Sequence, residues 1–146
     1  MVKTISKPIN GFFEEYRWLS NFWEVPVTVT GIQYGSTEAA YQAAKTVDID
    51  ERQKFIGLTP GQAKRLGSKI QLRANWNIVK LEIMELVLRA KFMTHKDLQQ
   101  KLIDTGDCEL IEFNTWGDTY WGMTKKHGGK NILGKLLMNI REDLTK

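Results

Sequence analysis

Apolar residues alternate with polar ones at strand spacing in one short stretch near the N-terminal third of the chain. Val25, Val27 and Val29 are separated by single polar residues or proline, which is the period of a half-buried strand. Thr30-Gly31 follows as a turn signal, and residues 32–34 can form a second short strand. The pattern therefore predicts a small β-hairpin over residues 25–34.

Helical spacing or helix boundary signals mark most of the remaining chain. The expected helices cover Glu51–Ile56, Pro60–Leu66, Trp76–Phe92, Thr94–Asp104 and a last segment that begins near Asn131. Thr59-Pro60 is typical of a helix start, and we expect Asn75 and Thr94 to cap the helices that follow them.

Two of these helices have a clear apolar stripe. The stripe expected for the helix over 76–92 consists of Ile78, Leu81, Met84, Val87 and Leu88. The stripe of the last helix consists of Leu133, Leu136, Leu137, Ile140 and Leu144. Each stripe can cover one side of a core.

The rest of the chain adds little regular structure. Residues 1–10 are polar and are expected to be loosely held, residues 108–113 resemble a short strand, and residues 114–129 are rich in turn signals. We find no linker, internal repeat or low-complexity tract. The expectation is one compact, helix-rich α+β domain over residues 1–146, with a small β-hairpin and short strands.

The stretch Gly35–Lys45 is unlike the other helical segments, because it has two different faces. Four alanines form a small face that a neighbouring element can approach closely. Glu38, Tyr41, Gln42 and Lys45 fall at i, i+3, i+4 and i+7 and form one polar stripe. The stripe is compatible with a solvated face whose charges suit the helix dipole, or with a set of groups that bracket a ligand.

Composition narrows the function classes. The single cysteine excludes an internal disulfide and fits a reducing compartment, and no apolar run approaches a membrane span, so a cytoplasmic protein is expected. The net charge of +4 mildly favours phosphate-bearing ligands. Two histidines and one cysteine at no recognisable spacing do not indicate a metal site, and we expect neither metal nor cofactor.

The remaining chemistry-bearing residues point to a glycosidic bond. Glu38 and Asp118 can flank a ribose and protonate a leaving nitrogen, while a desolvated Lys45 can attack a sugar carbon. Phosphate is expected either at the start of the last helix, Gly128–Asn131, or at a basic surface that includes Lys64 and Arg73. Residue spacing alone leaves a purely structural helix as an alternative.

The chain resembles the NADAR family of YbiA-like N-glycosidases along nearly its whole length. The segments that carry the resemblance include Leu19-Ser20-Asn21-Phe22, Gly31 to Lys45, Lys91-Phe92, Asp118-x-x-Trp121-Gly122 and Gly129-x-Asn131-x-Leu133-Gly134. The resemblance implies an α+β fold and hydrolysis of the bond between a phosphorylated ribose and an exocyclic amine. Lys45 matches the family's lysine, and Glu38, Trp76, Asp118 and Trp121 match its active-site positions.

This resemblance implies ADP-ribosyl guanine, in a nucleotide or in DNA, as the first candidate substrate. Intermediates of riboflavin biosynthesis are the alternative, and a non-catalytic module that binds ADP-ribose or nucleic acid is the alternative of another class. The expected catalytic residues are Lys45, Glu38 and Asp118. The expected substrate contacts are Asn21, Tyr41, Gln42, Trp76, Trp121, Gly122, Asn131, Lys64 and Arg73.

Overall fold

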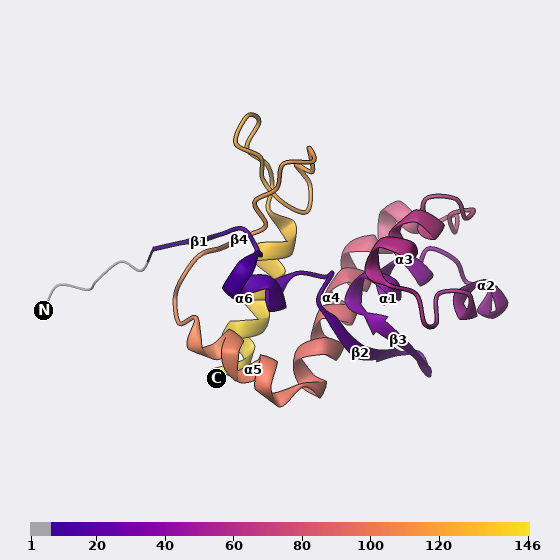
Figure 1. The fold of residues 1–146 in the computed structure, drawn as a ribbon, viewed down its shortest axis with the longest axis horizontal. Helices are drawn as coiled ribbons and strands as arrows, with labels where there is room; N and C mark the ends of the chain where they lie inside the picture. Colours follow the sequence, from indigo (N-terminus) through magenta and orange to yellow (C-terminus); the bar gives the residue numbers. More distant parts are fainter. Residues whose placement is uncertain (1–6) are drawn as a thin grey trace, which may run out of the picture. The chain divides into compact units, whose positions relative to one another are not determined.

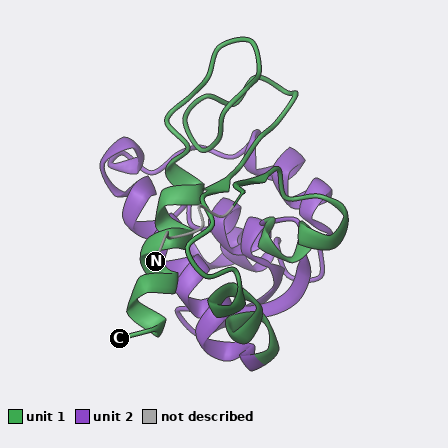
Figure 2. Ribbon diagram, turned by 90° about the vertical axis from the view of Figure 1, so that its left-hand side faces the viewer, with its two compact units in different colours: residues 1–20, 97–146 green, residues 21–96 purple. Residues whose placement is uncertain are grey.

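A β-hairpin and a series of helices account for most of the residues that the computed structural model describes, which are residues 7–146 (Figure 1). The chain divides into two compact units, coloured separately in Figure 2. The central unit consists of residues 21–96. The terminal unit consists of the described part of residues 1–20 together with residues 97–146.

The central unit contains the hairpin and the helices α1 to α4. Its elements are β2 (Glu24–Val29), β3 (Ile32–Ser36), α1 (Thr37–Ala43), α2 (Ile49–Gln53), α3 (Pro60–Gly67) and α4 (Trp76–Thr94). Helix α1 packs against the hairpin, α3 and α4, so it is covered from several sides. The α+β class predicted from the sequence is confirmed.

The predicted hairpin is present in the central unit. Val27 pairs with Tyr34 and Val29 pairs with Ile32 in an antiparallel ladder. The two turn residues, Thr30 and Gly31, have φ angles of 49° and 82°. This left-handed pair is the backbone of the tight turn that matches the twist of a hairpin.

The terminal unit has the last two helices and a small parallel sheet. Its elements are β1 (Ile9–Asn10), the 3-10 helix η1 (Glu14–Leu19), α5 (Lys96–Asp104, which begins at the boundary residue), β4 (Leu110–Ile111) and α6 (Ile132–Leu144). Ile9 pairs with Leu110 and is buried, so the expectation that residues up to 10 are loosely held is wrong for β1. Residues 1–6, to which that expectation also applied, lie outside the described residues.

Several predicted helix boundaries need correction. The short helix begins at Ile49, because Asp48 accepts hydrogen bonds from the N–H groups of residues 50 and 51 at 2.8 and 3.4 Å. Asn75 does not cap α4 with its side chain, which instead accepts a hydrogen bond from Arg73 Nε at 2.8 Å. Thr94 is the last residue of α4 and not the cap of α5.

The buried face of α4 also differs from the prediction. Met84, Val87 and Leu88 are buried as expected, but Ile78 is 80% exposed and Leu81 is 42% exposed. Ile78 follows the buried Trp76 by two residues, which places it about 200° away around the helix. The buried stripe of α4 is therefore anchored by an aromatic residue in its first turn and not by Ile78. In α6 the predicted stripe is buried through Ile140.

Lys91 lies on the buried stripe of α4 and is fully inaccessible to solvent. It follows Met84 by seven residues and Leu88 by three, so its position belongs to the apolar spacing of this helix. Burial lowers the pKa of Lys91 to about 7, because a charged ammonium is poorly solvated in the protein interior.

We predict that Lys91 makes the stability of the protein depend on pH above neutrality. In the unfolded chain Lys91 titrates near its ordinary pKa of about 10.4, so between pH 7 and 10 the unfolded state binds more protons. The free energy of unfolding should therefore gain up to about 1.4 kcal/mol per pH unit from this residue across that range. Urea denaturation of wild type and Lys91→Met at several pH values measures the difference.

The exposed Lys101 on α5 provides the control for this experiment. Lys101→Met should follow the wild-type pH dependence, because its side chain is solvated in both states. Parallel wild-type and Lys91→Met curves between pH 7 and 10 would contradict the prediction.

Candidate active site

Helix α1 is held at its first turn by Ser36 and Asn21. The Ser36 hydroxyl accepts a hydrogen bond from the Ala39 N–H at 3.1 Å and so caps the helix. The Thr37 hydroxyl donates to the Asn21 side-chain oxygen at 3.0 Å, and the Glu38 N–H donates to the Asn21 carbonyl at 3.1 Å. Asn21, an expected substrate contact, thus has a structural role at the start of α1.

Glu38 and Gln42 form a buried pair on α1. The Gln42 amide donates a hydrogen bond to Glu38 Oε1 at 2.8 Å, and the two residues are 7% and 5% exposed. The other end of the amide, Gln42 Oε1, is buried without a hydrogen-bond partner among the described residues. A solvated polar stripe is therefore wrong for this part of the helix.

Gly67, the last residue of α3, makes room for the Gln42 side chain. A Cβ added at Gly67 would overlap Gln42 Oε1 and lie 2.7 Å from its Cδ. The close approach of α3 to α1 thus depends on the absence of a side chain at this position.

Tyr41 and Trp76 form an aromatic wall beside the end of α1. Their ring centroids are 5.3 Å apart with an interplanar angle of 54°, and both residues are almost fully buried. Lys45 Nζ lies 6.0 Å from the centroid of the Tyr41 ring. The structure therefore groups three predicted site residues from α1 and from the first turn of α4.

Lys45 follows the last turn of α1 and is partly buried. Burial lowers its pKa, the positive charge of Lys64 lowers it further, and the negative charge of Glu38 opposes both effects. The net shift is downward, so more of the neutral amine is present at neutral pH than for a free lysine. The neutral amine is the nucleophilic form.

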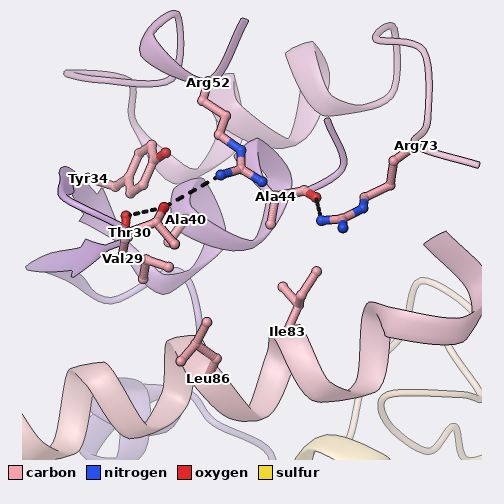
Figure 3. A pocket seen from close by; sticks show the side chains of 9 residues that line it. All are labelled: Val29, Thr30, Tyr34, Ala40, Ala44, Arg52, Arg73, Ile83 and Leu86. Atoms are coloured by element: carbon pink, nitrogen blue, oxygen red, sulfur yellow. Dashed lines mark hydrogen bonds between the residues drawn. The ribbon is translucent and has the colours of Figure 1, made fainter. Parts of the chain in front are cut away.

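The two basic residues expected to bind phosphate have different neighbours. Lys64 acts electrostatically on Lys45, and its ammonium lies 5.8 Å from the ring centroid of Phe22. The Arg73 guanidinium instead donates to the Ala44 carbonyl at 3.4 Å and lines a pocket on the alanine face of α1 (Figure 3). That the two residues serve one basic surface stays a prediction.

In the terminal unit, Asp118 organises a turn. Its Oδ1 accepts hydrogen bonds from the N–H groups of Tyr120 and Trp121 at 3.0 and 2.9 Å. The Trp121 ring packs edge-on against Tyr120, with centroids 4.7 Å apart. A Cβ added at Gly122 would overlap the carbonyl of Glu112. Glycine at position 122 is therefore required for the close approach of its backbone to that of Glu112.

The start of α6 does not offer free backbone N–H groups to a phosphate. The N–H groups of residues 130–133 donate to the carbonyls of residues 119–122 at 2.8 to 3.2 Å. The Asn131 side chain is also engaged, because it accepts from the Glu112 N–H and donates to the Leu110 carbonyl, both at 2.9 Å. The expectation of an open anion site at Gly128–Asn131 is therefore wrong, while a direct substrate contact by Asn131 stays a prediction.

The predicted site residues thus fall into two groups. Asn21, Glu38, Tyr41, Gln42, Lys45, Lys64, Arg73 and Trp76 belong to the central unit, whereas Asp118, Trp121, Gly122 and Asn131 belong to the terminal unit. That all of them serve one cleft stays a prediction. Sequence reasoning assigned no role to Arg52 or Tyr34, which carry no motif and become neighbours only when α2 packs beside the hairpin (Figure 3).

Metal clusters and membrane-spanning helices are both missing from the described residues, 7–146. Within them, no three or more histidine, cysteine, aspartate or glutamate side chains gather in a way that could hold a metal ion. No helix in the same residues combines the length and the apolar composition that a membrane crossing requires.

Comparison with known proteins identifies the fold and the family. The NMR structure of the Escherichia coli protein YbiA matches 97% of this chain and 88% of its own, with a TM-score of 0.84 and 36% identity. The chain therefore has a YbiA-like α+β fold. It belongs to the NADAR domain family, whose model matches residues 10–145.

The curated relatives carry two kinds of name. N-glycosidase YbiA from Escherichia coli K12 is 38% identical over 135 residues, which are 90% of this chain and 84% of the relative. Riboflavin biosynthesis protein VVA0006 from Vibrio vulnificus is 35% identical over 134 residues, which are 90% of this chain but only 36% of that longer protein. The family thus includes proteins named as glycosidases.

We predict that Gly67→Ala destabilises the protein by about 1–3 kcal/mol, because the new methyl group must displace the Gln42 amide from its bond with Glu38. Gly61→Ala on the same helix is the control, since its Cβ would meet only the end of the Arg65 side chain at 3.8 Å. That variant should be unchanged or more stable by about 0.4–1 kcal/mol. Thermal unfolding of the two variants tests the difference, and equal effects would refute the close packing of Gln42 on Gly67.

Proposed function

We propose that this protein is an N-glycosidase that hydrolyses the bond between a phosphorylated ribose and an exocyclic amine, with ADP-ribosyl guanine, as nucleotide or in DNA, as its substrate. The observation that carries the proposal is the environment of Lys45 on the Glu38 face of α1. Partial burial and Lys64 lower the pKa of this lysine, and Glu38, in the first turn of α1, has its carboxylate held by Gln42. The relatives named N-glycosidase support the reaction class.

The chemistry follows from the lability of a ribose attached to an exocyclic amine. Such an aminal can open, so that C1′ becomes part of an imine with the base nitrogen. The neutral amine of Lys45 adds to C1′, the base amine leaves after it takes up a proton, and a lysine imine remains. Water then adds to this imine and releases the sugar and the free lysine amine. Glu38 or Asp118 carries the protons in these steps.

A second route uses the same residues without a covalent intermediate. In this route the carboxylates protonate the leaving amine and activate a water molecule, and Lys45 contributes only its positive charge. The lowered pKa of Lys45 favours the covalent route, because it increases the fraction of the neutral, nucleophilic amine, whereas a cationic contact requires the charged form.

Intermediates of riboflavin biosynthesis are the second candidate substrates. They are favoured by the names of two relatives, VVA0006 and the chloroplastic protein PYRR from Zea mays. A non-catalytic binder of ADP-ribose or nucleic acid is the alternative of another class. The buried glutamate and the partly buried lysine argue against it, since burying ionisable groups costs stability that simple binding does not require.

The substrate question is tested by incubating the purified protein with guanine-ADP-ribosylated DNA, with ADP-ribosyl guanine nucleotide and with the riboflavin intermediates. Mass spectrometry identifies the products. We expect release of ADP-ribose from guanine. Turnover of the riboflavin intermediates alone would select the second candidate, and binding without turnover of any of them would refute the proposal of an enzyme.

We predict that Lys45→Ala and Lys45→Arg both abolish turnover and leave the fold intact, because neither supplies a neutral primary amine. Borohydride added during turnover should trap a ribosyl adduct on Lys45, visible by peptide mass spectrometry. Trapping should increase with pH through the lowered pKa of Lys45, as the neutral amine accumulates.

The exposed Lys69 is the control residue, and Lys69→Arg should keep wild-type activity. Near-normal activity of Lys45→Arg without a trapped adduct would instead establish the carboxylate route. In that case Glu38→Gln should still lower kcat by about 10²–10⁴-fold, the usual contribution of a general acid or base.

A further inference from the structure

A second pocket lies within the central unit, against the alanine face of α1. Its volume is about 120 Å³, and its wall comes from the hairpin, α1, α2, α4 and the segment before α4 (Figure 3). Ala40 forms its α1 side and lies about 160° around the helix from Glu38, and Ala44, the residue that ends the helix, lines the pocket one turn further on. Helix α1 therefore stands between this pocket and the polar stripe proposed for catalysis.

Two guanidinium groups line the pocket. Arg52 donates to the Thr46 carbonyl at 2.8 Å and to the Thr30 hydroxyl at 3.5 Å. Arg73 donates to Asn75 Oδ1 at 2.8 Å and to the Ala44 carbonyl at 3.4 Å. A guanidinium has five N–H donors, so three remain on each arginine after these contacts. Among the described residues neither arginine is paired with a carboxylate.

Tyr34 adds a third donor. The residue is only 3% exposed, and its hydroxyl makes no hydrogen bond with any residue in the part of the chain that the structure describes. Figure 3 shows the hydroxyl on the side of the ring toward Arg52. Burial raises the pKa of Tyr34 more than the charge of Arg52 lowers it, so the hydroxyl keeps its proton. The hydroxyl can therefore donate a hydrogen bond to an acceptor that enters the pocket.

The remainder of the wall is apolar and limits the size of an occupant. Val29, Ile83 and Leu86 line the side opposite the arginines, and no acidic residue lines the pocket. An engineered cavity of about 150 Å³ is large enough for benzene, so about 120 Å³ accepts a group of similar or slightly smaller size.

We propose that this pocket binds a small organic anion, whose carboxylate or phosphate head is held by Arg52, Arg73 and the Tyr34 hydroxyl and whose short apolar body packs on Ile83 and Leu86. Arginine forks match the geometry of both oxyanions, and the tyrosine adds a neutral donor. The site is separate from the polar stripe, and binding is measured without turnover. Its test is therefore independent of the proposed glycosidase activity.

Benzoate is the probe for this site, with benzamide as its neutral counterpart and inorganic phosphate as the anion without an apolar body. NMR titrations of the full chain should show saturable shifts for Ala40, Ala44 and Leu86 with benzoate. Benzamide and phosphate should each bind at least about tenfold more weakly, since one lacks the charge and the other the apolar contact. Absence of saturable shifts with benzoate, or equal binding of all three probes, would overturn the proposal.

Two substitutions connect the binding to the named residues. Tyr34→Phe removes the hydroxyl without breaking a described hydrogen bond and should weaken benzoate binding about tenfold, while Tyr16→Phe in the terminal unit should leave it unchanged. Leu86 is half exposed, so Leu86→Glu should fold and should repel the anion, whereas Leu86→Gln should retain most of the affinity. Unchanged binding in both Tyr34→Phe and Leu86→Glu would exclude this pocket as the binding site.

Discussion

The burial of α1 on both of its faces is the constraint on which the central unit depends. Alanines allow the hairpin and α4 to approach one face, and Gly67 allows α3 to approach the other. A helix of seven residues cannot be stable by propensity alone, so these contacts supply its stability. The same contacts remove polar side chains from water, and each of these must then find a partner.

The polar groups at the two ends of α1 have different hydrogen-bond partners. At the first turn, Ser36 and Asn21 provide oxygen atoms that accept from Ala39 N–H, Glu38 N–H and the Thr37 hydroxyl. After the last turn, the carbonyls of residues 44–46 accept from Arg73 Nη1, Arg73 N–H and Arg52 Nε. Cationic donors at the end of a helix also suit its dipole. The backbone of Lys45 is thus held at the end of α1, and its ammonium lies beside the Tyr41 ring.

The turn-rich part of the terminal unit is built by backbone pairing more than by side-chain packing. The carbonyls of residues 119–122 accept the N–H groups that begin α6, and Asp118 accepts two further N–H groups within the same loop. Asn131, which has a left-handed backbone with φ of 52°, joins β4 to this loop through its amide. A loop without regular structure is in this way held in place by hydrogen bonds of its backbone.

Local patterns in the sequence determined the elements and the fold class. Alternating valines indicated the hairpin, Thr59-Pro60 the start of α3, and the leucine stripe the buried side of α6, because each signal depends on neighbours within a few residues. The polar stripe of α1 was visible for the same reason. Only the tertiary structure decided which side of α4 is buried and which partners Asn75, Asn131 and Arg73 bind. These features depend on which residues distant in sequence become neighbours, and hydrogen-bonding side chains such as asparagine and arginine take whichever partner the packing brings within reach.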